Sequence, residues 1–398
     1  MEKKRILIAN KFYYPRGGDC IVAMNLERLL KEQGHDVAVF AMDYPENVDS
    51  GWNKYYASQV EMTGGVFSKL HAFNRIMGYG DIKTSFNKIL DDFKPDIVHL
   101  HNIHSYISPV VAKLAKQRGC RVVWTLHDYK LVCPSYACLF NGRPCEQCIG
   151  HSKKSVYKNH CLKGSMAASA MAYVEARRWN RYKLESMTDA FICPSQFMAS
   201  KMRKDGFNPD KLHVVCNHID PMKLQLFNSL NDAHDDYYVY IGRLSSEKGV
   251  ETLLKVASML PYTLKVAGDG PLRRQLEEQY AANRNIEFLG HQNALQVAML
   301  LSKAKFSVVP SEWYENNPLS VIESLCAGTP VVGAHTGGIP ELLDKSNGIT
   351  FISGKKDELL QAIKHAFNAE WNNAMIKGLA IRRFSAECHL RKIEEIYQ

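Results

Sequence analysis

The sequence lacks a hydrophobic run long enough to cross a membrane. A membrane-spanning helix needs about 18 or more consecutive apolar residues, and the 398 residues contain no such run. The sequence also lacks the long apolar leader of an exported protein, since a strand-like pattern begins already at Arg5. We therefore expect no signal peptide and a cytoplasmic protein.

Cysteine, by contrast, is plentiful. Without an export signal, eleven cysteines indicate reduced thiols or metal binding in place of disulfides. Cys145 and Cys148 form a Cys-x2-Cys pair, which is typical of zinc ligands, and Cys133 and Cys161 would complete a set of four thiolates. The alternative is a loop of reduced thiols, so the segment 133–161 predicts either a structural zinc site or an ordinary loop.

Charge is unbalanced in favour of cations. Fifty Lys and Arg residues against 41 Asp and Glu give a net charge of +9, which suits nucleic acid, acidic lipid head groups or phosphorylated substrates. Residues 165–187 predict one long helix rich in Arg and Lys, and such a helix is suited to contact an anionic membrane surface. The alternative is a solvated helix face.

The chain opens with a strand–helix–strand pattern. Apolar residues at 5–9 and 37–40 predict strands around a helix that ends at Gly34. Consecutive units of this kind form parallel, doubly wound sheets, so we predict an α/β fold. Gly17 and Gly18 precede the helix, where backbone N–H groups are able to approach an anionic ligand.

The same pattern restarts after a polar segment, residues 221–236, which we interpret as a linker between two domains. Further strands are predicted at 95–101, 121–126, 190–195 and 212–215 in the first domain. In the second domain they are predicted at 237–241, 264–267, 285–290 and 306–309.

Two polar segments of the second half follow predicted strands. In Gly242–Gly249, Arg243 and Lys248 place two cations between a strand and a helix, where they would stabilise the charge of a diphosphate leaving group. After strand 306–309, Glu315 lies in a loop. Asn317 is expected to cap the next helix and Pro318 to occupy its first position, so that Glu323 falls in the second turn.

These segments together resemble a known family. Pro310-Ser311-x3-Glu315-x2-Pro318-Leu319-x3-Glu323-x3-Ala327-Gly328-x-Pro330-Val331-Val332 is similar to the signature of the retaining GT-B glycosyltransferases of family 4, and Gly242-Arg243-Leu244-x2-Glu247-Lys248-Gly249 matches a second family motif. The resemblance implies that Glu315 holds the donor sugar and Glu323 the ribose.

The resemblance implies further site residues. His127, within Thr125-Leu126-His127-Asp128, would touch the donor sugar beside the reaction centre, whereas His99, His101 and His104 are weaker candidates. Donor binding is expected to involve a set of residues from both halves of the chain: Gly17, Gly18, Arg243, Lys248, Gly268, Asn316, Asn317, Pro318 and Leu319.

The family's fold and activity are expected here as well. Two Rossmann-like domains would face each other across a cleft: residues 1–220 on the acceptor side, carrying the Cys-rich insertion, and residues 221–375 binding the donor. Residues 376–398 would form a helix that packs back on the first domain. The expected reaction moves a hexose from a nucleotide-diphosphate donor to a glycan or lipid-linked acceptor in cell-envelope polysaccharide synthesis.

The sequence contains no hydrophobically flanked Asp-x-Asp motif. We therefore expect no metal at the diphosphate and no cofactor in the chemistry. Two alternatives remain at this point. Another enzyme of the same fold, such as a sugar-nucleotide epimerase or a phosphorylase, would keep Arg243 and Lys248 without needing Glu315. A basic, zinc-containing nucleic-acid-binding protein has only the cysteines and the charge in its favour, and we expect no nucleic-acid partner.

Overall fold

The computed structural model describes residues 2–61, 64–230 and 235–398. The chain divides into two compact units. Unit 1 comprises Met1–Cys138, Glu146–Val215 and Leu390–Gln398, and unit 2 comprises Leu139–Cys145 and Cys216–His389. The sequence placed the corresponding boundaries at residues 220 and 375. Each unit contains its own six-stranded sheet.

The sheet of unit 1 is parallel, with the strand order β2-β1-β3-β4-β7-β8. Most residues of its central strands are apolar because helices cover both faces of such a sheet. Ile6 in β1 pairs with Val37 on one side and Ile97 on the other. The strands are β1 (Arg5–Ala9), β2 (Asp36–Phe40), β3 (Ile97–Leu100), β4 (Arg121–Thr125), β7 (Ala190–Cys193) and β8 (Leu212–Val214).

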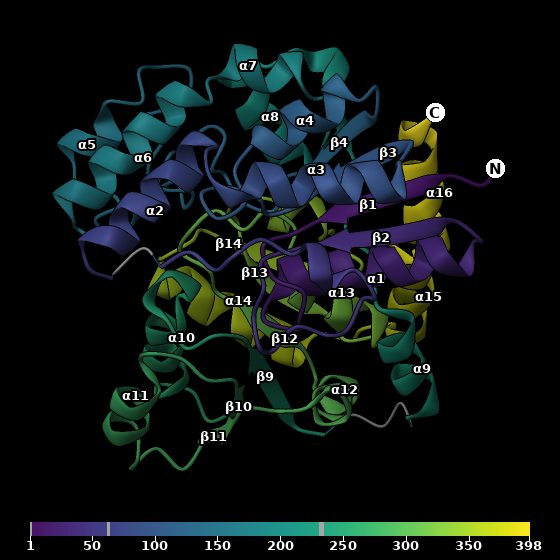
Figure 1. Ribbon diagram of the computed structural model, residues 1–398. Helices are drawn as coiled ribbons and strands as arrows, with labels where there is room; N and C mark the ends of the chain where they lie inside the picture. Colours follow the sequence, from purple (N-terminus) through teal and green to yellow (C-terminus); the bar gives the residue numbers. More distant parts are fainter. Residues whose placement is uncertain (1, 62–63, 231–234) are drawn as a thin grey trace. The chain divides into compact units, whose positions relative to one another are not determined.

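Helices connect these strands (Figure 1). They are α1 (Gly18–Glu32), α2 (Val66–Met77), α3 (Asp81–Phe93), α4 (Val110–Gln117), α5 (Ser155–Lys158), α6 (Met166–Arg178), α7 (Arg181–Ser186) and α8 (Gln196–Lys204), with short 3-10 turns η1 (Asn53–Tyr55) and η2 (Pro209–Lys211). The prediction of one helix over 165–187 is wrong. The chain breaks at Trp179–Asn180, where the Asn180 side chain accepts a hydrogen bond from the Lys183 N–H and caps α7.

Unit 2 repeats the arrangement with the parallel order β11-β10-β9-β12-β13-β14. Its strands are β9 (Tyr237–Ile241), β10 (Thr263–Ala267), β11 (Ile286–Gly290), β12 (Ser307–Val309), β13 (Val331–Ala334) and β14 (Gly348–Phe351). Its helices are α9 (Pro221–Ser229), α10 (Val250–Ala257), α11 (Arg273–Gln279), α12 (Ala294–Lys303), α13 (Leu319–Cys326), α14 (Lys356–Asn368), α15 (Asn373–Phe384) and the start of α16 (Ala386–Tyr397), with 3-10 turns η3 (Ser246–Lys248) and η4 (Ile339–Glu341).

Two apolar clusters cover the two faces of the unit 2 sheet. Alternate side chains of a strand point to opposite faces, and in β9 Tyr238 and Tyr240 join one cluster whereas Tyr237 and Val239 join the other. The first cluster includes α10, α11 and α14, and the second includes α9, α12, α13 and α15. The predicted α/β class with doubly wound parallel sheets is thereby confirmed.

Two local predictions fail in unit 2. The segment 221–236 is not a plain linker, because Pro221–Ser229 is helix α9, with Pro221 in its first turn and the Asp220 side chain accepting from the Met222 N–H at 2.9 Å. Residues 231–234 of that predicted linker lie outside the described residues. The sequence also predicts a helix that begins near Pro340, after Gly337-Gly338, but this segment forms only the three-residue turn η4.

The cysteine-rich segment contains a small hairpin. Strands β5 (Leu139–Phe140) and β6 (Arg143–Pro144) pair antiparallel around Asn141 and Gly142. Both turn residues have positive φ, 49° and 71°, as the Asn-Gly turns of two-residue hairpins require.

Among the described residues, no helix combines the length and the apolar character needed to cross a membrane.

Candidate functional site in each unit

The motifs of unit 2 that are predicted to bind the donor follow neighbouring parallel strands. Arg243 and Lys248 follow β9, Gly268 follows β10, and Glu315 follows β12. The strand order reverses direction between β9 and β12, since β10 lies on one side of β9 and β12 on the other. Ligands of open α/β sheets bind beyond the carboxyl ends of the strands at such a reversal.

Glu315 and Lys248 form the centre of this site. The Lys248 Nζ donates to Glu315 Oε1 at 2.6 Å, and the Glu315 side chain is only 10% exposed. Ser311 Oγ and Trp313 Nε1 donate to the same oxygen at 2.8 and 2.9 Å. Burial by itself raises the pKa of Glu315, but the charge of Lys248 and these hydrogen bonds outweigh it and hold the pKa below its usual value. Glu315 is therefore an ionised, fixed acceptor of hydrogen bonds.

Glycines allow the backbone to approach this pair closely. Gly249 has φ +69°, and a Cβ there would lie 2.0 Å from the Pro310 carbonyl oxygen. Gly268 has φ +142°, and a Cβ there would lie 1.9 Å from the Gly242 oxygen. The turns after β9 and β10 and the loop before Glu315 thus pack at distances that only glycine permits.

The loop after β13 holds the Glu315 backbone. The Gly338 N–H donates to the Glu315 carbonyl at 2.7 Å, and a Cβ on Gly337 (φ +59°) would lie 2.0 Å from that carbonyl oxygen. Gly337→Ala is therefore expected to lower the free energy of unfolding by about 1–3 kcal/mol and to displace Glu315. Urea denaturation measures the first effect, and the rate of the sugar transfer expected from the sequence measures the second.

Gly378→Ala is the matched control for this change. Gly378 lies inside α15, and a Cβ added there would have nothing within 4 Å, so alanine is expected to stabilise the protein by about 0.5–1 kcal/mol. Equal stability of wild type and Gly337→Ala would contradict the close packing on Glu315.

The other predicted donor-site residues are placed differently. Arg243 is solvent-exposed. Glu323 Oε1 pairs with Lys223 Nζ of α9 at 2.5 Å, a partner that the sequence did not reveal because 221–236 was interpreted as a linker.

The prediction that Asn317 caps α13 is wrong. The residue at the N-terminal boundary of α13 is Pro318, which makes no side-chain cap. Asn317 Oδ1 accepts instead from the backbone N–H of Asn217 at 2.9 Å and from Cys216 Sγ at 3.2 Å. Asn217 Nδ2 in turn donates to the Asn317 carbonyl at 2.9 Å. Asn317 therefore fixes the loop that contains Asn316 and Pro318, and Leu319 begins the helix.

Unit 1 places His127 and the glycine pair at the corresponding edge of its own sheet. Gly17 and Gly18 follow β1, and His127 follows β4. The order β2-β1-β3-β4 reverses direction between β1 and β3. Gly17 has extended backbone angles and forms the N-terminal boundary of α1, and its carbonyl accepts from the Ile21 N–H at 3.0 Å.

His127 lies in a row of imidazoles. Its Nε2 is 2.9 Å from His101 Nδ1, and the two rings stack at 5.2 Å. His101 also stacks on His99, whose Nδ1 is 2.6 Å from the Tyr397 hydroxyl and whose Nε2 is 2.8 Å from Thr125 Oγ1. Burial is the main effect on His127 and lowers its pKa, against the opposing charges of Asp19 and Asp128. His127 is thus a neutral ring whose Nε2 is oriented by His101.

Asp19 is a site residue that the sequence did not reveal. It lies in the first turn of α1, accepts from Asn102 Nδ2 at 2.7 Å and lies 3.8 Å from Lys11 Nζ. Burial raises the pKa of Asp19, but the charge of Lys11 and the hydrogen bond from Asn102 bring it below its usual value. The sequence offers one signal for Asp19: it is an acidic residue in the first turn of a helix that follows Gly17-Gly18.

The cysteines are not gathered in a ready metal site. Cys133, Cys148 and Cys161 belong to unit 1, and Cys145 belongs to unit 2. Each is a reduced thiol, and the Cys133 Sγ lies 3.2 Å from Ser135 Oγ. Within residues 2–61, 64–230 and 235–398, no group of three or more His, Cys, Asp or Glu side chains is arranged to hold a metal ion.

Comparison with known proteins identifies the class. A family model described as "Glycosyl transferases group 1" matches residues 223–378, and one described as "Glycosyltransferase Family 4" matches residues 16–223. With its two parallel, Rossmann-like sheets, the chain is a glycosyltransferase of the GT-B fold. More narrowly, it belongs to Glycosyltransferase Family 4, as its motifs predicted.

Relatives and solved structures extend along the whole chain. An uncharacterized 42.6 kDa protein in the cps region of Klebsiella pneumoniae is 27% identical, over 92% of this chain and 96% of its own. The sucrose-phosphate synthase of Thermosynechococcus elongatus has a TM-score of 0.68 at 18% identity, covering 99% and 98% of the two chains. Anabaena Alr3699/HepE in complex with UDP and glucose has a TM-score of 0.63 at 18% identity, covering 99% of each chain. These structural likenesses show the fold.

Proposed function

We propose that this protein is a retaining hexosyltransferase that moves a sugar from a nucleoside diphosphate sugar to a hydroxyl of a glycan or lipid-linked acceptor. The observation that carries the proposal is the buried Lys248–Glu315 pair at the strand reversal of unit 2. The structure of Anabaena Alr3699/HepE with UDP-glucose supports a nucleotide-sugar donor, and the cps-region relative supports cell-envelope polysaccharide synthesis.

Each residue has a role that its chemistry suits. The Glu315 carboxylate, fixed by three donors, accepts hydrogen bonds from the hydroxyls of the donor hexose. Arg243 and Lys248 stabilise the charge that develops on the diphosphate as the glycosidic bond breaks. Gly268 brings backbone close to the nucleotide. Glu323 accepts from the ribose hydroxyls, which requires it to share its carboxylate with Lys223.

The transfer itself needs no metal at the diphosphate in this proposal. The acceptor hydroxyl attacks the anomeric carbon on the face from which the diphosphate leaves, and a phosphate oxygen of the donor takes up its proton. Configuration at the anomeric carbon is thereby retained. In unit 1, His127, neutral and held at Nε2 by His101, is proposed to bind a sugar hydroxyl, and the backbone at Gly17 and Gly18 to approach a phosphate group.

Thermal shift with a nucleotide panel tests the donor assignment. A ligand that binds only the native state stabilises it by mass action and so raises the melting temperature. At a ligand concentration 100 times the dissociation constant, the free energy of unfolding rises by about 2.7 kcal/mol. We expect one of UDP, GDP, ADP or CMP, or its sugar conjugate, to raise the melting temperature with or without chelator. If no nucleotide or nucleotide sugar shifts it, the donor assignment is wrong.

A structural zinc at Cys133, Cys145, Cys148 and Cys161 is a separate proposal. The Cys-x2-Cys spacing supports it, whereas the thiols would have to move closer to one another to bind an ion. Elemental analysis of the purified protein tests it directly. About one equivalent of zinc, lost together with stability on treatment with chelator, would support the site, and a metal-free protein of full stability would refute it.

Peripheral contact with the cytoplasmic face of an anionic membrane is the proposed location. On α2, Val66, Phe67 and Leu70 are 80, 88 and 56% exposed. Helix α6 lies beside α2, and α5 lies beside α6 (Figure 1). Residues 151–183 carry eight Lys and Arg against the single acid Glu175, which is buried. Exposed apolar side chains beside cations suit the interface of an anionic bilayer.

Vesicle co-sedimentation tests this location. The wild type is expected to bind phosphatidylglycerol vesicles, less so at high salt, and not phosphatidylcholine vesicles. Phe67→Ser with Leu70→Ser is expected to weaken binding at least tenfold, because each inserted side chain contributes roughly 1.5–3 kcal/mol. Met259→Ser, which alters another exposed apolar side chain, is expected to bind as wild type. Unchanged binding by the double variant would exclude α2.

A further inference from the structure

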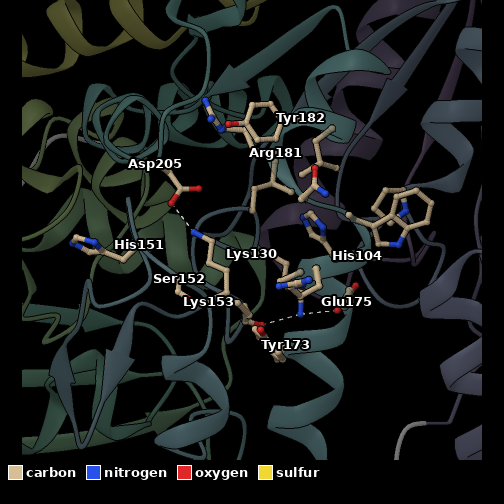
Figure 2. Close-up of a pocket in the computed structure, with 18 of the residues that line it drawn as sticks. His104, Lys130, His151, Ser152, Lys153, Tyr173, Glu175, Arg181, Tyr182 and Asp205 are labelled. Carbon is tan, nitrogen blue, oxygen red and sulfur yellow. Dashed lines mark hydrogen bonds and ion pairs between the residues drawn. The ribbon is translucent and has the colours of Figure 1, made fainter.

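A pocket of 480 Å³ lies within unit 1, and none of the donor motifs of unit 2 lines it. Residues of α6 and α7 form one side, and the segments 130–134 and 150–153 form the other (Figure 2). His104 also lines the pocket, and its Nε2 lies 4.0 Å from Asp128, the residue next to His127. The pocket therefore lies near the row of imidazoles formed by His99, His101 and His127.

Two lysines are fixed in the pocket wall by buried carboxylates. Lys130 Nζ pairs with Glu175 at 2.9 Å and donates to the Pro134 carbonyl at 2.8 Å. Lys153 Nζ pairs with Asp205 at 2.5 Å and donates to two further carbonyls at 2.7 and 2.9 Å. Figure 2 shows both lysine–carboxylate pairs inside the pocket. An ammonium has three N–H donors. Contacts within the described part of the chain use all three of Lys153 and two of Lys130.

Two arginines add positive charge that these carboxylates do not balance. Arg177 and Arg181 line the pocket together with the two lysines, so four cations face two carboxylates. Glu175 is already engaged by Ser105, whose N–H and hydroxyl donate to it at 2.9–3.0 Å. Burial lowers the pKa of His104 to about 3, so this residue is neutral and adds no charge. The side chains that line the pocket therefore carry a net charge of about +2, and two of the four cations are guanidinium groups.

The remaining lining suits a sugar. The rings of Tyr173, Trp179 and Tyr182 border the pocket, and Arg181 lies 4.4 Å from the centroid of Tyr182. Guanidinium groups bind phosphate oxygens through paired N–H donors, and aromatic rings supply flat apolar faces. Cations and rings in one pocket match a group that is part sugar and part phosphate.

From this arrangement we propose that the pocket binds the phosphate or diphosphate group of a phosphorylated glycosyl acceptor. The inference rests on the proposed transferase function and adds the acceptor's chemical class to it. Such a group belongs either to a soluble sugar phosphate or to a sugar linked through a diphosphate to a lipid. The chemistry recognised by Arg177 and Arg181 is the same in both cases.

Isothermal titration calorimetry with hexose 1-phosphate, and separately with a short-chain isoprenyl diphosphate hexose, tests the proposal. Arg181→Gln and Arg177→Gln are each expected to weaken binding at least tenfold relative to wild type, as is expected when a charged hydrogen bond is lost. The control Arg274→Gln changes an arginine whose side chain is 93% exposed on α11 of unit 2. It is expected to bind as wild type.

The results distinguish a lipid-linked from a soluble acceptor, and they distinguish failure of the pocket proposal from failure of the donor assignment. Tighter binding of the isoprenyl compound assigns a lipid-linked acceptor, and equal binding assigns the soluble class. Equal affinities in wild type, Arg177→Gln and Arg181→Gln, or equal binding of the unphosphorylated methyl hexoside, would overturn the proposal. The nucleotide thermal shift of Arg181→Gln should equal that of wild type, so the pocket assignment is able to fail while donor binding stands.

Discussion

Glu315→Gln is expected to slow sugar transfer by about 10²–10³-fold, the loss typical when one fixed electrostatic group of an active site is removed. Glutamine keeps the volume of the side chain but removes the negative charge that Lys248, Ser311 and Trp313 surround. Nucleotide affinity should change little, because the proposed contact of Glu315 is with the hexose. Initial rates with the donor identified by thermal shift measure the first effect, and nucleotide titration measures the second.

Glu312→Gln is the matched control in the same loop. Its carboxylate accepts from Thr252 Oγ1 at 2.6 Å and faces α10, so transfer should stay within a few-fold of wild type. Wild-type rates in Glu315→Gln would refute the role assigned to Glu315. An equal loss in both variants would instead indicate that the loop, and not the carboxylate, is what matters.

Lys248→Met is expected to damage both stability and rate. The substitution leaves the Glu315 carboxylate, 10% exposed, without its cation. Removing one partner of a buried ion pair costs about 3–5 kcal/mol, and we expect about 3 kcal/mol because Lys248 is 27% exposed. Transfer should also slow by about 10²–10³-fold, since a cation is lost at the leaving group. Urea denaturation and initial rates measure the two effects.

The double variant Lys248→Met/Glu315→Gln separates pairing from catalysis. It removes both charges, so it should be more stable than Lys248→Met while its transfer rate stays at least as low as that of the single variants. Arg274→Met, in an exposed pair with Glu278, should cost less than about 1 kcal/mol. Strictly additive effects of the two site substitutions would mean that Lys248 and Glu315 do not stabilise each other.

Much of the fold was predictable because its strands are buried on both faces. Such strands are apolar at most positions, and runs such as Ile6–Ala9 and Val331–Val332 are visible without any tertiary information. A glycine of the predicted motifs was also identifiable from the sequence, because its backbone conformation requires glycine. Gly249, in the motif Gly242–Gly249, has positive φ and approaches the Pro310 carbonyl too closely for a Cβ, so the motif fixes its identity.

What could not be predicted depends on contacts between distant segments. Lys223 and Glu323 are 100 residues apart, and His101 and His127 are 26 apart. Asn317 has the local properties of a helix cap, yet it bonds to Cys216 and Asn217. Trp179, at the break of the helix after Arg178, donates its ring N–H to the Ile76 carbonyl, 103 residues away. No local pattern contains these partners.

The grouping of Leu390–Gln398 with unit 1 has a consequence for synthesis. Tyr397 bonds His99 and the Ile396 carbonyl accepts from Arg121 at 2.8 Å, so these residues complete packing that begins in β3 and β4. All of unit 2 is translated before they emerge. Unit 2 is thus able to reach its native packing before residues 390–398 have been synthesised. Unit 1 contains the residues that are translated first, but it completes its packing after unit 2.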